Sequence, residues 1–165
     1  GLMNGTSDTA FSPNATTSRG MIVTILYRLA GSPDMPESNW GYPYADVDTN
    51  AYYSAPVYWA RMNDLVTGYS DTQFGPNDAI TREQLTAILY RYAQYKGCDV
   101  SVGEDTNILS YTDAAQVAEY AIPAFQWAVG AGIINGTTAS TLSPKGSATR
   151  GQVAAILHRY CEWIG

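Results

Sequence analysis

Three arginines recur in one setting, and that setting suits the binding of an anion. Arg19, Arg82 and Arg150 each directly follow a Ser or Thr residue and directly precede an apolar-periodic segment. Ser and Thr are favoured at helix N-caps, so each guanidinium is expected in the first turn of a helix. The helix dipole disfavours a cation there by about 0.3 to 1 kcal/mol, whereas a guanidinium and free N–H groups at a helix N-terminus together suit a carboxylate. We therefore predict that these arginines contact an anionic ligand.

A structural role is the alternative for the same arginines. A loop acid could pair with each guanidinium, and Asp8 and Asp71 occupy matching positions in the first two settings. The third setting has Ala139 at that position, so the salt-bridge alternative fails there. The dipole favours cations at a helix C-terminus, so three further arginines toward that end of the same segments need no functional explanation: Arg28, Arg91 and Arg159.

Tryptophan and glycine add two weaker candidates for ligand contact. Trp59 and Trp127 could each stack on the face of a sugar ring, and a buried core role is equally expected for them. Gly5, Gly68 and Gly136 occupy one repeated position. Glycine allows a positive φ or a close approach of the backbone to a ligand, and we expect these glycines to serve mainly backbone geometry.

The arginines belong to a block that the chain repeats three times. The block runs from residue 5 to 19, from 68 to 82 and from 136 to 150, with a Ser-Pro or Gly-Pro pair at matching positions. Corresponding residues lie 63 positions apart between the first two blocks and 68 apart between the last two. Repeated units of this kind pack on one another and share a core. A device present three times suits a multivalent ligand better than a single catalytic centre.

Each block leads into a segment with the period of an amphipathic helix. Apolar residues follow the spacing i, i+3, i+4 and i+7 over residues 22–29, 85–92 and 153–160. This pattern predicts a helix with one buried face in every copy. Gly31 and Gly97 are typical of residues that end such a helix.

The helix starts carry a second signal, which two of the three copies complete. Thr81 with Gln84, and Thr149 with Gln152, have the spacing of a capping box. Ser18 is expected to cap alone, because a methionine occupies the third helical position of the first copy.

The second and third copies also predict an earlier helix, near residues 54–65 and 122–133. The first copy has no such segment before its block, which leaves the apolar stripe of residues 22–29 one neighbour short. We therefore expect an upstream segment, a protein partner or a rearranged terminus to complete the first repeat.

Composition bounds the class of protein. The 165 residues fit one compact domain, 1–165, and 45% hydrophobic content is typical of a globular chain. The net charge of −6 argues against binding nucleic acid or anionic lipid surfaces. The least charged stretch, residues 120–134, is shorter than a membrane span requires, so no membrane insertion is expected. Cys98 and Cys161 occupy non-equivalent positions; unpaired apolar residues are the favoured interpretation, and a disulfide in an extracellular chain is the other.

No constellation of residues predicts an enzyme, a cofactor or a metal. Residues 46–50 place Asp, Asp and Asn as in a calcium loop, but Ala51 and Val57 replace the glycine and glutamate that the loop needs. His158 is the single histidine, and nothing near it in the sequence completes a catalytic triad. Phosphate-binding glycine loops and zinc-ligand spacings do not occur.

These features together resemble the S-layer homology domain family. The second copy shows them most fully: an aromatic-Ala-Asp start at Tyr44, a Trp-Ala pair at Trp59, and an Ile-Thr-Arg sequence at Ile80. The copies span residues 44–97, 111–163 and, for the later half alone, 1–31. The Thr-Arg-Ala-Glu motif of the family appears as Ser-Arg-Gly-Met, Thr-Arg-Glu-Gln and Thr-Arg-Gly-Gln, so its glutamate is absent from every copy.

The resemblance implies an all-α fold of helix-loop-helix repeats, in a pseudo-threefold arrangement around a central bundle of the later helices. It also implies a non-catalytic module that binds secondary cell-wall polysaccharide, commonly pyruvylated, in grooves between repeats on the surface of Gram-positive bacteria. A structural or assembly module that binds protein partners through its repeat surfaces is the alternative function. The residues predicted to contact the ligand are Arg19, Arg82, Arg150, Thr81, Thr149, Gln84, Gln152, Trp59, Trp127, Gly68 and Gly136.

Overall fold

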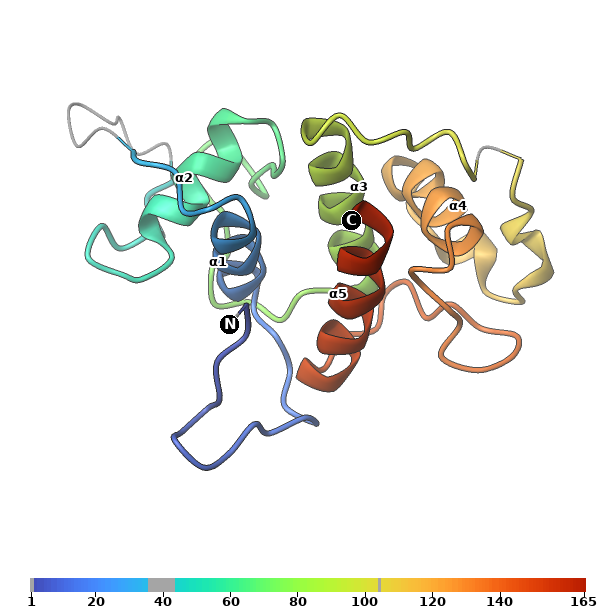
Figure 1. Ribbon diagram of the computed structural model, residues 1–165, viewed down its shortest axis with the longest axis horizontal. Coiled ribbons are helices and arrows are strands. Elements are labelled where there is room, and N and C mark those ends of the chain that lie inside the picture. Colours follow the sequence, from blue (N-terminus) through green and yellow to red (C-terminus); the bar gives the residue numbers. More distant parts are fainter. Residues whose placement is uncertain (1, 36–43, 104) are drawn as a thin grey trace. The chain divides into compact units, whose positions relative to one another are not determined.

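The computed structural model describes residues 2–35, 44–103 and 105–165 and is all-α, as predicted (Figure 1). The chain divides into two compact units. Unit 1 comprises Gly1–Phe11 and Thr17–Ala79, and unit 2 comprises Ser12–Thr16 and Ile80–Gly165. The threefold arrangement of the repeats stays a prediction.

Unit 1 is built on two helices, α1 (Arg19–Leu29) and α2 (Ser54–Met62). Ser18 caps α1 alone by accepting a hydrogen bond from the third helical N–H, as expected. The two helices pack on each other, with the Tyr27 and Trp59 rings edge to face at a centroid distance of 5.6 Å. The chain leaves α1 through Gly31, whose φ of +87° is the left-handed conformation expected after a helix end.

The burial of the apolar stripe on α1 corrects one expectation. Ile22, Ile25 and Leu26 are 1%, 5% and 1% exposed, so the stripe predicted to need an external neighbour is already covered. The prediction was wrong because the chain itself already buries this stripe. The opening helix of the second copy, α2, packs on the other side of α1, at Gly20 and Tyr27.

Unit 2 repeats this pairing and adds a third long helix. Its elements are α3 (Arg82–Tyr95), the 3₁₀ turns η1 (Ile108–Ser110), η2 (Ala114–Gln116) and η3 (Glu119–Ala121), then α4 (Ile122–Gly130) and α5 (Arg150–Ile164). The α3 and α4 helices pack on each other, with the Tyr90 and Trp127 rings 5.5 Å apart. Aromatic rings also join α5 to both: Tyr160 lies 6.2 Å from Tyr92 and 6.2 Å from Trp127.

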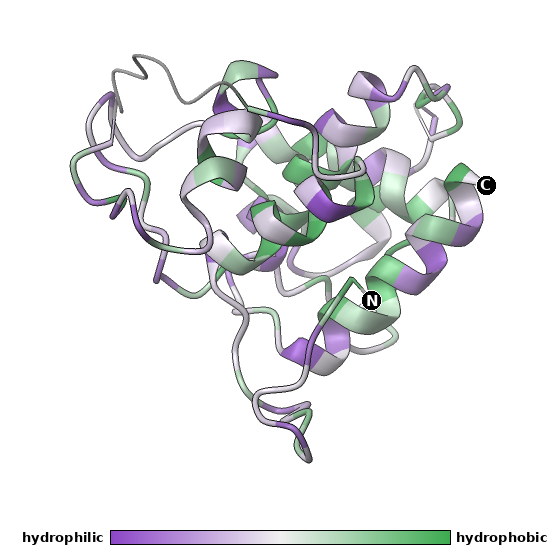
Figure 2. Ribbon diagram, turned by 60° about the vertical axis from the view of Figure 1, so that its left-hand side comes forward, coloured by the Kyte–Doolittle hydropathy of each residue, from purple (hydrophilic) through white to green (hydrophobic). Residues whose placement is uncertain are grey.

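Both capping boxes are confirmed. At α3 and α5 the N-cap threonine hydroxyl accepts from the third helical N–H, and the glutamine side chain at that position accepts from the N-cap N–H. The helices carry alternating apolar and polar bands along their length, as helices with one buried face should (Figure 2).

The opening helices end earlier than predicted, at Met62 and Gly130 rather than near residues 65 and 133. Asp64 and Gly132 have φ values of 55° and 70°, and this left-handed conformation stops the helix. Both cysteines, Cys98 and Cys161, are free and half-buried. The described part of the chain contains no helix that is both long and apolar enough to cross a membrane.

Candidate functional site

Each unit has one candidate site, at the loop that follows its opening helix, α2 in unit 1 and α4 in unit 2. We call residues 67–79 the unit 1 loop and residues 135–147 the unit 2 loop. Each is fixed by one aspartate from the start of its copy, which accepts two successive backbone N–H groups. In unit 1, Asp46 accepts from Phe74 at 2.9 Å and Gly75 at 2.7 Å. In unit 2, Asp113 accepts from Leu142 at 2.8 Å and Ser143 at 2.7 Å.

These aspartates were missing from the predicted site. From the sequence, Asp46 belongs to the aromatic-Ala-Asp start of the second copy and to a rejected calcium loop, and no role in holding a loop is predicted for Asp46 or Asp113. The available signal was that the same Tyr-x-Asp spacing occurs twice, because an acid kept at one position of a repeat is often bound to backbone N–H groups.

The first turns of the long helices meet loop carbonyls. In α1, the N–H of Arg19 donates to Asp78 at 3.0 Å and that of Gly20 to Pro76 at 2.8 Å. The matching bonds run from α3 to the unit 2 loop and from α5 to residues 13 and 15, at 2.8 to 3.0 Å. The third N–H of each helix donates to its cap hydroxyl. The prediction of free N–H groups for an anion was therefore wrong, because tertiary contacts supply their acceptors.

The arginine side chains also hold the loops. The Nε and Nη2 atoms of Arg19 donate to the carbonyls of Phe74 at 2.9 Å and Thr67 at 3.1 Å. Its guanidinium carbon lies 4.6 Å from the centroid of the Tyr69 ring and 4.7 Å from that of Phe74, within range of a cation–π interaction.

Arg82 repeats this geometry in unit 2. Its Nε donates to Leu142 at 2.8 Å and its Nη2 to Asn135 at 2.9 Å. Burial lowers the pKa of the Arg82 guanidinium, and the neighbouring Asp113 carboxylate partly opposes that shift. Arg19, Arg82 and Arg150 are only 4%, 4% and 6% exposed. These observations give Arg19 and Arg82 a structural role through main-chain carbonyls, and ligand contact by the three arginines stays a prediction.

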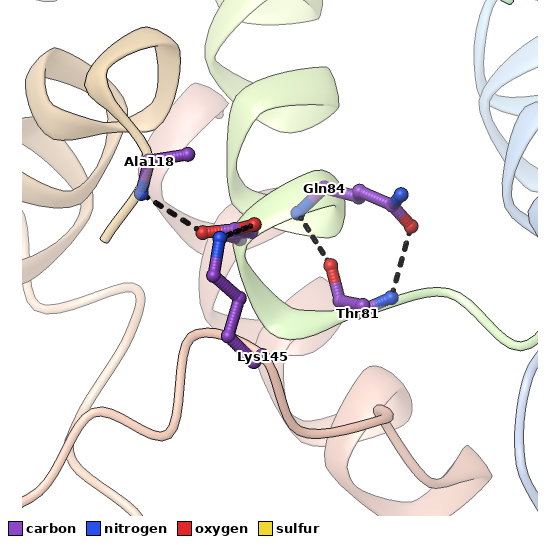
Figure 3. Close-up of polar contacts among 5 residues, drawn as sticks. Thr81, Gln84, Ala118 and Lys145 are labelled. Carbon is purple, nitrogen blue, oxygen red and sulfur yellow. Dashed lines mark hydrogen bonds and ion pairs between the residues drawn. The ribbon is translucent and has the colours of Figure 1, made fainter. Parts of the chain in front are cut away.

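The predicted cap residues contribute hydrogen bonds inside the protein. Figure 3 shows Thr81 and Gln84 joined at the start of α3, where N···O distances are 3.2 and 3.1 Å. Thr149 and Gln152 form the same pair at α5. All four are half-buried, and their contact with a ligand likewise stays a prediction.

The tryptophans are core residues. Trp59 is 2% exposed and Trp127 1%, so neither ring offers a face on which a sugar could stack. Gly68 and Gly136 are required by close approach: a Cβ would lie 2.3 Å from the carbonyl oxygen of Gln73 or of Thr138. These close contacts are with the backbone of the same loop and not with a ligand. Gly68 and Gly136 therefore serve backbone geometry, as expected, although neither has a positive φ.

The unit 1 loop surrounds a hollow with a volume of about 250 Å³. We call it the unit 1 hollow. Tyr69 presents a ring that is 53% exposed, and Gln73 and Asn77 add amide groups. An aromatic face beside several hydrogen-bonding groups suits a sugar ring, which has apolar C–H faces and hydroxyl edges. The residues that line it are Asp46, Tyr69, Gln73, Gly75, Pro76, Asn77 and Asp78.

The unit 2 loop has different chemistry at the matching positions. Lys145, which replaces Asn77, forms an ion pair with Glu83 at 2.6 Å (Figure 3). The other oxygen of the buried Glu83 carboxylate accepts from the N–H of Ala118 at 3.0 Å. Thr137, in place of Tyr69, bonds the hydroxyl of Ser143 at 2.6 Å. The unit 2 loop therefore directs its polar groups toward one another.

The sequence matches the family model described as S-layer homology domain over residues 43–86 and 110–154. It is 30% identical to an amylopullulanase of Thermoanaerobacterium thermosulfurigenes, over 99% of this chain and 8% of that protein. It is 27% identical to the exoglucanase XynX of Acetivibrio thermocellus, over 98% of this chain and 14% of the relative. It is 26% identical to a surface-layer 125 kDa protein of Lysinibacillus sphaericus, over 98% and 13%. The chain thus spans less than a sixth of the length of each of these relatives.

Proposed function

Because the chain belongs to the S-layer homology domain family, we propose that it anchors its protein by binding secondary cell-wall polysaccharide. S-layer homology domains are non-catalytic modules that anchor proteins to the cell wall, which places this chain outside the cell, at the wall or surface layer. We extend the family assignment to residues 1–31 as a truncated first copy. Its Ser cap and Arg19 have the same hydrogen-bonding geometry as Thr81 and Arg82 of the second copy.

The unit 1 hollow is the contact that best supports this proposal. A pyranose ring would stack on Tyr69, and its hydroxyl groups would bond the side chains of Gln73 and Asn77. Arg19 lies against the Tyr69 ring, and Asp46 accepts two N–H groups of the loop. Both interactions keep the loop in one conformation before a ligand binds. A preformed site of this kind loses less conformational entropy on binding.

A pyruvylated polysaccharide is the ligand that we propose, and its carboxylate needs a cation. Lys145 has a side chain that is 56% exposed and lies beside the start of α3. Direct contact with the carboxylate by Arg82 and Arg150 remains part of the proposal. Because both residues are buried, such contact requires a ligand that displaces loop residues.

The alternative function, a protein-binding assembly module, is no longer supported by the observation that first favoured it. It depended on an uncovered stripe on α1, and that stripe is buried within the chain. Catalysis by this chain is not part of the proposal, although two of its relatives have the names of glycan-degrading enzymes.

A sedimentation assay with purified Gram-positive cell walls tests the function. We expect the unaltered chain to sediment with walls, and Tyr69→Ala to bind at least tenfold more weakly, because the stacking face is lost. Tyr120→Ala is the matched control, since that ring is 51% exposed and lies outside the hollow. No binding by the unaltered chain would contradict the anchoring function. Equal binding by Tyr69→Ala and the control would contradict only the location of the site.

A further inference from the structure

The unit 2 loop begins with an asparagine followed by a glycine, a pair whose backbone can react with its own side chain. Glycine has no Cβ, so its backbone nitrogen meets little steric hindrance when it attacks the side-chain amide of a preceding asparagine. Asn135 is exposed, whereas Ile134 before it is 1% exposed. The reactive side chain is therefore open to water, and the chain on its N-terminal side is held in the core.

Arg82 acts on one carbonyl of this pair. Its Nη2 donates to the main-chain oxygen of Asn135 at 2.9 Å, and its Nε donates to that of Leu142 at 2.8 Å. The arginine is 4% exposed, so its surroundings hold it in this geometry. A donor about 2.7 to 3.1 Å from an oxygen on which negative charge develops lowers the barrier to attack on that carbonyl. The main-chain carbonyl of Asn135 is thus the more reactive of the two carbonyls of this residue.

We propose that Asn135 is a site of spontaneous deamidation and that Arg82 directs the product toward isoaspartate. The nitrogen of Gly136 attacks the Cγ atom of Asn135 and loses its proton, the bond from Cγ to the side-chain nitrogen breaks, and ammonia leaves. The resulting succinimide ring contains both carbonyls of residue 135. Water then adds to the main-chain carbonyl, which Arg82 polarises. The bond from that carbon to the Gly136 nitrogen breaks, and the nitrogen takes up a proton. The inference does not depend on polysaccharide binding.

The product alters the unit 2 loop at its first residue. In isoaspartate the chain continues through Cγ, which lengthens the backbone by one carbon, and the former main-chain carbonyl becomes a carboxylate beside Arg82. Gly136 has no room to take up the added length, because even a Cβ there would lie 2.3 Å from the oxygen of Thr138 and 2.7 Å from that of Thr141. The bond of 2.8 Å from the Thr137 N–H to Thr141 must therefore shift.

Unit 1 provides the matched comparison within the same chain. Thr67 occupies the position of Asn135, and its main-chain carbonyl accepts from Arg19 at 3.1 Å. A threonine therefore supplies the same acceptor without a side-chain amide that could react. The scaffold of the loop does not need an asparagine at this position, so Asn135 can be replaced without loss of the bond to the arginine.

Peptide mapping by mass spectrometry, after the 165-residue protein has aged at mildly alkaline pH, measures the reaction. We expect Asn135 to convert at least tenfold faster than Asn77, which is exposed in the unit 1 loop and precedes an aspartate. The second Asn-Gly pair, at residues 4 and 5, lies in a separate peptide and is measured separately. A synthetic peptide of residues 130–141 contains the reactive pair without Arg82. The ratio of isoaspartate to aspartate at residue 135 should be at least twofold higher in the protein than in this peptide.

Asn135→Thr places the unit 1 residue in the unit 2 loop and should abolish the conversion at this position. In the unaltered chain, the amide signals of Thr137 and Thr141 should change on ageing in proportion to the isoaspartate content, and in the variant they should stay constant. The proposal is overturned by equal rates at Asn135 and Asn77, by equal product ratios in the protein and the peptide, or by loop signals that do not respond to the conversion.

Discussion

The unit 1 and unit 2 loops share one scaffold and differ in the surface they expose. In both, an aspartate accepts two loop N–H groups, and a buried arginine from the long helix of the preceding copy donates to two loop carbonyls. Unit 1 then exposes Tyr69 beside a hollow, whereas unit 2 exposes Lys145, paired with Glu83. The repeated residues therefore build the loops, and the residues that differ between copies decide what each loop can bind.

The largest expected loss of stability comes from a substitution that disrupts the scaffold shared by both loops. Arg82→Ala removes two charge-assisted hydrogen bonds and leaves the carbonyls of Asn135 and Leu142 without those donors. We expect a loss of about 3 kcal/mol in the free energy of unfolding, because each bond to a charged group contributes about 1.5 to 3 kcal/mol. Urea unfolding followed by tryptophan fluorescence measures it.

Arg159→Ala is the control for that prediction. Arg159 is only half-buried and makes a long bond of 3.4 Å to Ile133. A similar loss of stability in both variants would show that the buried position of Arg82 has no special role in the scaffold.

A smaller loss of stability is expected from substitutions that affect only the unit 2 loop. Glu83→Ala removes the ion pair with Lys145 and the acceptor for Ala118, and both interactions lie within unit 2. We expect a loss of about 1 to 2 kcal/mol, since a buried N–H loses its partner. Lys145→Met should lose less than about 1 kcal/mol, because the lysine end of the pair is largely exposed.

Amide hydrogen exchange distinguishes the units in these variants. Faster exchange should appear at the start of α3 and in the unit 2 loop, with α1 and the unit 1 loop unchanged. Equal acceleration in both units would contradict the assignment of this ion pair to unit 2 alone.

The last effect appears only at high pH. Burial raises the pKa of Tyr92 to about 12 from an ordinary value of 10, and unit 1 has Leu29 at the matching position. A raised pKa means that the folded state favours the neutral phenol. Its contribution to stability is therefore complete below pH 10 and is lost as pH rises through 12. The urea midpoint should fall in that range and fall less in Tyr92→Phe; identical pH dependence in both proteins would contradict this assignment.

Local features of the fold could be predicted from the sequence, whereas contacts between distant segments could not. The apolar spacing and the Thr81–Gln84 box depend on residues within a few positions, and the structure confirms both. The burial of the α1 stripe within this chain was missed because periodicity identifies a buried face but not the segments that cover it. The Glu83–Lys145 pair joins residues 62 positions apart, and neither residue type recurs at its position in the other copies.

The arginines show the same limit at the candidate site. The dipole argument treats each helix start as isolated, with free N–H groups and an unpaired guanidinium. In the folded chain, loop carbonyls accept from both the N–H groups and the Arg19 and Arg82 side chains. The repeated position identified Arg19 and Arg82 as important residues. Only the tertiary structure shows that their side chains hold a loop in place.

Titration of the isotope-labelled chain with a purified fragment of cell-wall polysaccharide tests the central claim most directly. If exposed residues that differ between copies bind the glycan, chemical-shift changes will be largest at Tyr69, Gln73 and Asn77, and the arginine Nε signals at the helix starts will change little. Changes concentrated on the Nε signals of Arg82 and Arg150, with the unit 1 hollow unaffected, would contradict it.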